Sequence, residues 1–114
     1  MSSTAPPAAI VAARRRLSNR RSHVLIDFEA DGFRYTAGIG HFEDGQLAEI
    51  FLNAEKGGTA IETAARDSAV VASIALQHGV PPDTIRHALT RNGNGDASGP
   101  LGTLLDLLAN EPAA

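Results

Sequence analysis

The 114-residue chain contains no cysteine and no tryptophan. Without cysteine it forms no disulfide, holds no thiolate-bound zinc ion and performs no thiol catalysis. Only 4% of its residues are aromatic, so we expect a core of Ile, Leu, Val and Ala. No apolar run approaches the roughly 20 residues that cross a bilayer. These absences favour a globular protein over membrane, disulfide-rich and zinc-ribbon classes.

The length suits one domain that can fold alone. Residues 1–22 are predicted to be a disordered N-terminus, residues 23–110 a single domain, and residues 111–114 a frayed tail. The start of the chain does not resemble a signal peptide, because its alanine-rich stretch is short and the basic residues follow it. We therefore expect a bacterial-type cytoplasmic protein without membrane attachment.

Positive charge is concentrated near the N-terminus. Five of the ten basic residues fall within the segment 14–21, called here the basic arm: Arg14, Arg15, Arg16, Arg20 and Arg21. Without these five charges, the net charge of −3 would become about −8. The chain is thus an acidic domain that carries a short basic arm.

Three segments have the alternating pattern of half-buried strands. Apolar residues alternate with others over residues 24–29 and again over residues 33–39, and Asp31-Gly32 between them predicts a hairpin turn. After a second Asp-Gly pair, residues 47–52 are apolar on both faces. We expect a three-stranded antiparallel meander whose third strand receives extra cover from a partner chain, from the arm or from a fourth strand.

A helical period begins after Gly58. Thr59 and Glu62 match a capping box, which predicts a helix from Ala60 to the Gly79 break. Its polar residues form one narrow stripe, predicted to face water: Glu62, Arg66, Ser73 and Gln77. The remaining surface is apolar enough to be covered on two sides, by the sheet and by the shorter helices or a second subunit.

Two shorter helices complete the predicted fold. The first covers residues 82–90, and the second begins at Pro100 with four leucines on one face. The fold class is therefore α+β, an antiparallel meander packed against one long helix and two short ones. A homodimer formed through the side of Val70 and Ile74, or through the third strand, is a further hypothesis.

One continuous block carries a resemblance to a known family. From Asp44 to Leu89 it reads DGQLAEIFLNAEKGGTAIETAARDSAVVASIALQHGVPPDTIRHAL. This block resembles the TSCPD domain, a small module that is found free-standing and at the C-terminus of adenosylcobalamin-dependent ribonucleotide reductases. The resemblance covers about residues 33–108. It implies the α+β fold and a connection to nucleotide reduction.

The chain departs from that family at the run after which the family is named. Where relatives have Thr-Ser-Cys-Pro-Asp, residues 97–101 read Ala-Ser-Gly-Pro-Leu, so Gly99 replaces the cysteine and Leu101 the acid. Any zinc or thiol role implied by the resemblance is therefore lost. A complete reductase also needs a radical-bearing cysteine, a thiol pair and a large barrel. We expect no catalytic residue, metal or cofactor, and no catalysis by this chain alone.

Two groups of residues are candidate binding sites. The turn before the long helix contains Lys56, Gly57, Gly58 and Thr59, whose N–H groups and positive charge could hold a phosphate or carboxylate. A tight turn that merely starts the helix explains the same residues.

The basic arm has two interpretations that stay open at this stage. Its five arginines could bind nucleic-acid phosphates, without base stacking because aromatics are missing. Alternatively, the arm docks on its own acidic domain or on an acidic protein partner. These give two hypotheses: an accessory or protein-interaction module that is related to the reductase domain and modulates nucleotide reduction, and a small nucleic-acid-binding protein.

Other polar residues predict structural roles. Asp67 lies at the boundary of the apolar arc of the long helix, so it is expected to pair with Arg34, Arg86 or a backbone cap. The four histidines are not spaced as metal ligands on one helix, and we interpret them as structural or surface residues.

Overall fold

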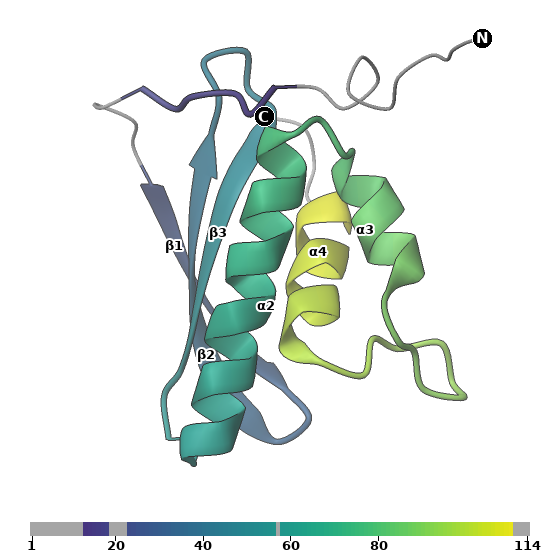
Figure 1. Ribbon diagram of the computed structural model, residues 1–114. Coiled ribbons are helices and arrows are strands. Elements are labelled where there is room, and N and C mark those ends of the chain that lie inside the picture. The colour runs from purple at the N-terminus through teal and green to yellow at the C-terminus, as the bar shows by residue number, and fades with distance from the viewer. Residues whose placement is uncertain (1–12, 19–22, 57, 111–114) are drawn as a thin grey trace, which may run out of the picture.

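The computed structural model describes residues 13–18, 23–56 and 58–110. Three strands precede three helices along the chain, and Figure 1 shows the sheet on one side and the helices on the other. The elements are β1 (His23–Ala30), β2 (Phe33–His41), β3 (Leu47–Ala54), α2 (Thr59–Gln77), α3 (Pro82–Ala88) and α4 (Pro100–Asn110). The predicted α+β fold, an antiparallel meander with one long helix, is confirmed.

The strands pair in the order β1-β2-β3, and both pairings are antiparallel. The predicted turn between β1 and β2 has Asp31 at φ 52° and Gly32 at φ 83°. Two successive left-handed residues form the tight hairpin turns whose twist matches that of the strands. The register between β2 and β3 shifts at Gly40 and His41, a bulge that bends the sheet just before the second hairpin.

Helices cover only one face of the sheet. On that face the apolar residues of β2 and β3 are buried, and α2 and α4 contribute alanines and leucines to the same core. The largest fully buried side chains are Ile39, Ile50, Leu52 and Leu104. The core is aliphatic, as the composition predicts, and its only buried tyrosine is Tyr35, whose hydroxyl pKa is raised by burial.

The long helix begins and ends close to its predicted limits, but not by the predicted cap. Gly58 is the N-cap, and Thr59 is already helical, with no side-chain hydrogen bond to the cap. The capping-box prediction is therefore wrong: the glycine backbone makes the turn, and the N–H of Glu62 donates to the carbonyl of Gly58. At the other end Gly79 adopts φ 95°, as expected for a residue just after a helix.

The two other helices form where they are predicted, with one difference in length. α3 is shorter at its C-terminus than expected and ends at Ala88. α4 begins at Pro100 and buries Leu101, Leu104 and Leu105. In Figure 1, α4 lies beside α2, and α3 lies beyond α4 on the outside of the molecule. None of the described helices combines the length and the apolarity that a membrane crossing requires.

The polar stripe of α2 is the main correction to the predicted fold. Ser73 and Gln77 do not face water but contact the outer edge of β3. The Ser73 hydroxyl accepts from the N–H of Ile50 and donates to its carbonyl, at 2.8 and 3.1 Å. The side-chain amide of Gln77 donates to the carbonyl of Ala48 at 3.1 Å. Hydropathy does not distinguish water from a strand edge as the hydrogen-bonding partner, so the sequence pattern could not predict this contact.

Candidate interaction surface

The described part of the basic arm docks on the C-terminal end of α2. The N–H of Arg15 donates to the carbonyl of Gln77 at 2.7 Å, and Nε of Arg14 donates to its Oε1 at 2.6 Å. The last carbonyls of a helix lack partners within the helix, and cations are favoured near them. Because α2 has no basic residue in its last turn, the arm supplies both the donor and the positive charge there.

Gln77 joins three parts of the chain. The residue is buried, with 4% of its surface exposed, and its side chain contacts both the arm and the edge of β3. A buried amide needs partners for its donor and its acceptor, and here Ala48 and Arg14 provide them. Gln77 is therefore the central contact of the docked arm.

Arg15 also reaches the hairpin between β2 and β3. Its guanidinium carbon lies 3.7 Å from the centre of the Phe42 ring, and its Nη2 lies 3.3 Å from a carboxylate oxygen of Asp44. The pKa of Asp44 is lowered, first by the N–H of Gln46 and further by Arg15. In Figure 1 the purple arm segment crosses above the end of α2 beside this hairpin. The arm thus connects the helix to the hairpin.

The remaining arm residues are less constrained. Arg16 is exposed and makes no hydrogen bond or ion pair with the described residues. Arg20 and Arg21 lie outside the described residues. The docking interpretation therefore applies to Arg14 and Arg15.

Beside the docked arm, β3 and α2 enclose a groove of about 300 Å³, called here the edge groove. Its apolar side chains are exposed: Phe51 by 49%, Val70 by 51% and Ile74 by 40%. Arg14 lines it near the end of α2, and Arg66 lines it further back along the helix. The Val70/Ile74 side and the third strand, two separate dimer surfaces in the sequence-based hypothesis, therefore belong to one surface.

A second groove lies on the opposite side of α2, against α3 and the start of α4. Its volume is about 410 Å³, and it is lined by Val71, Ala75, Ile85 and Leu89. Val71 is 67% exposed, so the shorter helices cover this side of α2 only in part. The expected two-sided cover of α2 is incomplete in the single chain.

Asp67 borders this second groove and corrects another prediction. It is exposed and makes no hydrogen bond or ion pair with the described residues. Its expected partners are engaged elsewhere: Arg34 lies near Glu29 and Glu55, and Arg86 pairs with acids of its own region. Exposure to water removes the desolvation cost that motivated the predicted ion pair.

The predicted anion site lies at the other end of the long helix. Lys56, Gly58 and Thr59 are exposed at the start of α2, and Gly57 lies outside the described residues. With 19 residues, α2 separates this turn from the docked arm by roughly 27 Å. The structure therefore does not combine the two predicted sites, and anion binding at this turn stays a prediction.

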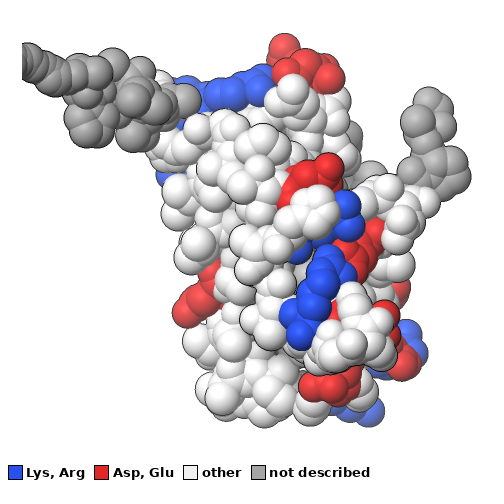
Figure 2. All heavy atoms as spheres, turned by 90° about the vertical axis from the view of Figure 1, so that its right-hand side faces the viewer, with Lys and Arg blue, Asp and Glu red and all other residues white. Residues whose placement is uncertain are grey.

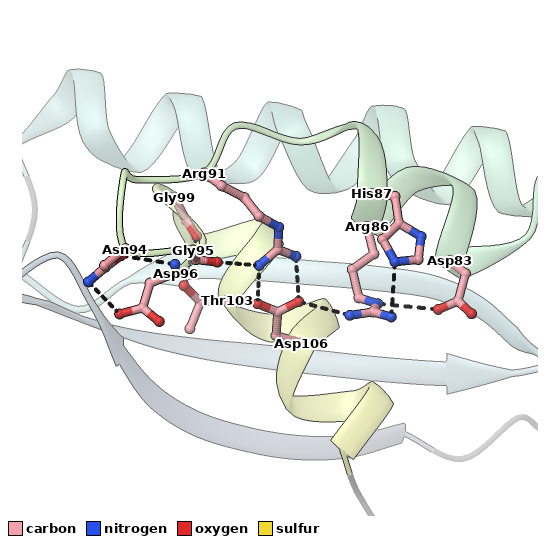
Figure 3. Close-up of polar contacts among 10 residues, drawn as sticks. All are labelled: Asp83, Arg86, His87, Arg91, Asn94, Gly95, Asp96, Gly99, Thr103 and Asp106. Atoms are coloured by element: carbon pink, nitrogen blue, oxygen red, sulfur yellow. Dashed lines mark hydrogen bonds and ion pairs between the residues drawn. The ribbon is translucent and has the colours of Figure 1, made fainter.

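A charge network joins the loop after α3 to α4. Arg91 binds both carboxylate oxygens of Asp106, at 2.7 and 2.9 Å, and Arg86 lies 3.4 Å from the same carboxylate. Arg86 also pairs with Asp83 at 3.2 Å. Figure 3 shows Asp106 between the two guanidinium groups, and Figure 2 shows acidic and basic atoms alternating over this face.

This network has the properties of a structural tie. The hydrogen bonds from Arg91 lower the pKa of Asp106, and the same contact raises the pKa of Arg91. Both groups therefore stay charged near neutral pH, which suits an ion pair, whereas a group that transfers protons needs a pKa near the working pH. Among the described residues, no three His, Asp or Glu side chains lie together as metal ligands. We therefore interpret this network as fastening the loop to α4.

The comparisons relate the chain to one group of enzymes. It is 30% identical over 81 residues to a vitamin B12-dependent ribonucleotide reductase of Bradyrhizobium diazoefficiens, and 32% identical over 77 residues to one of Agrobacterium fabrum. These matches cover 71% and 68% of this chain but only 6% of each reductase. The domain is therefore related to a segment of such reductases.

No family model matches the chain, so its membership of the TSCPD family stays a prediction. No solved structure matches it either.

Sequence reasoning did not identify Gln77, Phe42 or Asp44 as partners of the arm. Gln77 follows the arm by 63 positions in sequence. No local pattern reports a contact over such a separation. The Asp-Gly pair at Asp44 is a signal only for a turn.

Proposed function

We propose that this chain is an accessory, non-catalytic interaction module that acts with a vitamin B12-dependent ribonucleotide reductase and modulates nucleotide reduction. The observation that carries the proposal is the similarity of about 70% of the chain to a reductase segment, in a chain without cysteine. Such a chain supplies no thiol to the reduction. It retains a folded domain with which to contact another protein.

The surface of the domain supports binding rather than catalysis. Three of its exposed large apolar side chains line the edge groove, next to two arginines. Exposed apolar surface gathered at one place is typical of protein-interaction sites. The carboxylates with lowered pKa, Asp44 and Asp106, each contact an arginine.

The experiment combines the purified chain with the B12-dependent reductase of the same organism. Association is measured by biolayer interferometry, and deoxyribonucleotide formation is measured with and without the chain. We expect saturable binding and a changed rate of product formation. Absence of both binding and any change in rate would contradict the proposal.

Nucleic-acid binding through the arm is the alternative function. The contacts of Arg14 with Gln77 and of Arg15 with Asp44 hold this part of the arm against the domain, which favours the docking interpretation over a free arm. Fluorescence anisotropy of labelled DNA and RNA at two salt concentrations tests the alternative. The full chain is compared with a chain lacking residues 1–22. Tight, salt-sensitive binding that disappears with the arm would replace the accessory role by nucleic-acid binding.

A further inference from the structure

The edge groove is closed to one common mode of peptide binding. An exposed strand edge can accept an added strand through backbone hydrogen bonds. Here the carbonyl of Ala48 and both backbone groups of Ile50 already bond to Gln77 and Ser73. At these two residues the edge does not accept an added strand, which favours a partner that binds the groove through its side chains.

The apolar part of the groove is suited to such side chains. Phe51 projects from β3, and Val70 and Ile74 are one helical turn apart on α2. Residues spaced by four lie on the same face of a helix. The exposed ridge on α2 and the ring of Phe51 thus form two apolar walls.

The charges of the groove select the kind of partner. Nε of Arg14 bonds to the neutral amide of Gln77. Arg66 lies 3.4 Å from the Asn53 amide oxygen and 3.5 Å from a carboxylate oxygen of Glu62. Glu49 also lines the groove, but it is buried and lies 2.8 Å from the ring of His23. The groove therefore presents Arg14, and in part Arg66, to a carboxylate.

The separation of the two arginines gives the length of the partner segment. Arg14 is held at Gln77, and Arg66 stands about three helical turns earlier on α2, on the order of 16 Å along its axis. A helix of about three turns covers this distance. Its apolar side would contact Val70 and Ile74, and acidic residues near its two ends would meet the two guanidinium groups.

We propose that the edge groove binds a short, acidic, amphipathic helix of a protein partner. The inference rests on the proposed interaction role and names the partner by its chemistry. The acidic body of the chain repels such a helix elsewhere, so the two arginines also decide where it binds.

The test uses a fluorescein-labelled helical peptide of about 16 residues, with leucines along one face and glutamates in its first and last turns. A companion peptide has lysines in place of the glutamates. Anisotropy is measured with the full chain. We expect the glutamate peptide to bind, and the lysine peptide to bind at least about tenfold more weakly.

Variants locate the site. Val70→Asp should weaken binding of the glutamate peptide by about tenfold or more, since it introduces a like charge among the apolar contacts. Arg66→Gln should weaken it by about threefold and reduce its salt dependence. The matched control is Val71→Asp, one residue further on the same helix but in the other groove, which should leave binding unchanged. Circular dichroism checks that each variant is folded.

Several outcomes would overturn the inference: no binding, equal affinity for both peptides, or equal losses with Val70→Asp and Val71→Asp. A dimer in sedimentation equilibrium that Val70→Asp dissociates would also overturn it, because the occupant would then be a second copy. The peptide assay contains no reductase. Failure of the reductase experiment with peptide binding intact would therefore count against the proposed function alone.

Discussion

The two arginine clusters of this domain differ in what they contact. Around Asp106, Arg86 and Arg91 share one carboxylate, and their charges are compensated within the domain. In the arm, Arg14 bonds to a neutral amide, and Arg16 has no hydrogen bond or ion pair within the described part of the chain. Of the three arm arginines that the structure describes, Arg15 alone pairs with an acid, Asp44.

This difference separates structural from available charge. A guanidinium that shares a carboxylate with another is already used in holding the fold, whereas one on a neutral acceptor keeps most of its attraction for an anion. Counting arginines in the sequence points to the arm because five stand together. Their contacts indicate which of them remain available to a partner.

The largest expected effect is at Gln77. Gln77→Ala should lower the free energy of unfolding by about 1 to 3 kcal/mol, because the buried carbonyl of Ala48 loses its donor and Arg14 loses its acceptor. Urea unfolding measures the loss. Thr63→Ala, at an exposed position of the same helix, is the control and should stay within about 0.5 kcal/mol. A loss no larger than that of the control would mean that the arm contact is incidental.

The second largest effect on stability is expected in the charge network of Arg86, Arg91 and Asp106. Asp106→Asn should lower the free energy of unfolding by about 1 kcal/mol, because it weakens the charge-assisted hydrogen bonds from Arg91 and Arg86. The loss is modest because water partly screens these ion pairs. Asp83→Asn, at an exposed carboxylate paired only with Arg86, should change stability by less than about 0.5 kcal/mol. Similar losses from both variants, in urea unfolding, would argue against a central role for Asp106.

The same cluster predicts a dependence on pH. The pKa of Asp106 is lowered in the folded chain. Its ionised form therefore contributes fully to folding stability above the pKa of an aspartate in the unfolded chain, about 3.9. That contribution is lost as the pH falls through the lower folded pKa. The stability difference between the wild type and Asp106→Asn should therefore be constant near pH 7 and shrink below about pH 4. A difference that grew on acidification would contradict this assignment.

The smallest expected effect is at Arg15. Arg15→Lys keeps the charge but loses the planar contact with Phe42, which should cost about 0.5 kcal/mol. It should also loosen the arm, so trypsin should cut the segment 14–16 faster, as followed by mass spectrometry. Arg16→Lys changes a neighbouring residue without such contacts and should leave the rate unchanged. Equal acceleration by both substitutions would show that Arg15 does not hold the arm.

Much of the fold could be predicted because hydrophobic period and turn chemistry are local. The alternation in β2 and the Asp31-Gly32 turn predict the first hairpin, and Pro100 marks the start of α4. The errors concern polar groups. Thr59 does not cap α2, and Ser73 bonds to a strand edge. A polar side chain can satisfy its hydrogen bonds in several ways, and its local sequence does not choose among them.

The candidate surface could be predicted only in part. The sequence identifies the arm and singles out Val70 and Ile74, but it does not place Arg14 beside them. That placement depends on Gln77 lying at the end of α2, next to the edge of β3. For Asp67 the sequence predicts a contact that the structure does not have. The residue is exposed because α3 leaves this part of α2 uncovered, and that spacing is not encoded locally.

The two margins of the sheet are unequal. At β3, Ser73 and Gln77 bond to outer backbone groups of Ala48 and Ile50, whereas the edge of β1 that faces away from β2 pairs with no strand within the described residues. Where such a domain forms part of a longer polypeptide, a further strand joins its sheet more readily alongside β1 than at Ala48 and Ile50 of β3. Exposed Leu25 on β1 marks that margin. Insertions and fusions are therefore better tolerated structurally at the helical side than beside β1, where an unpaired strand invites non-native pairing.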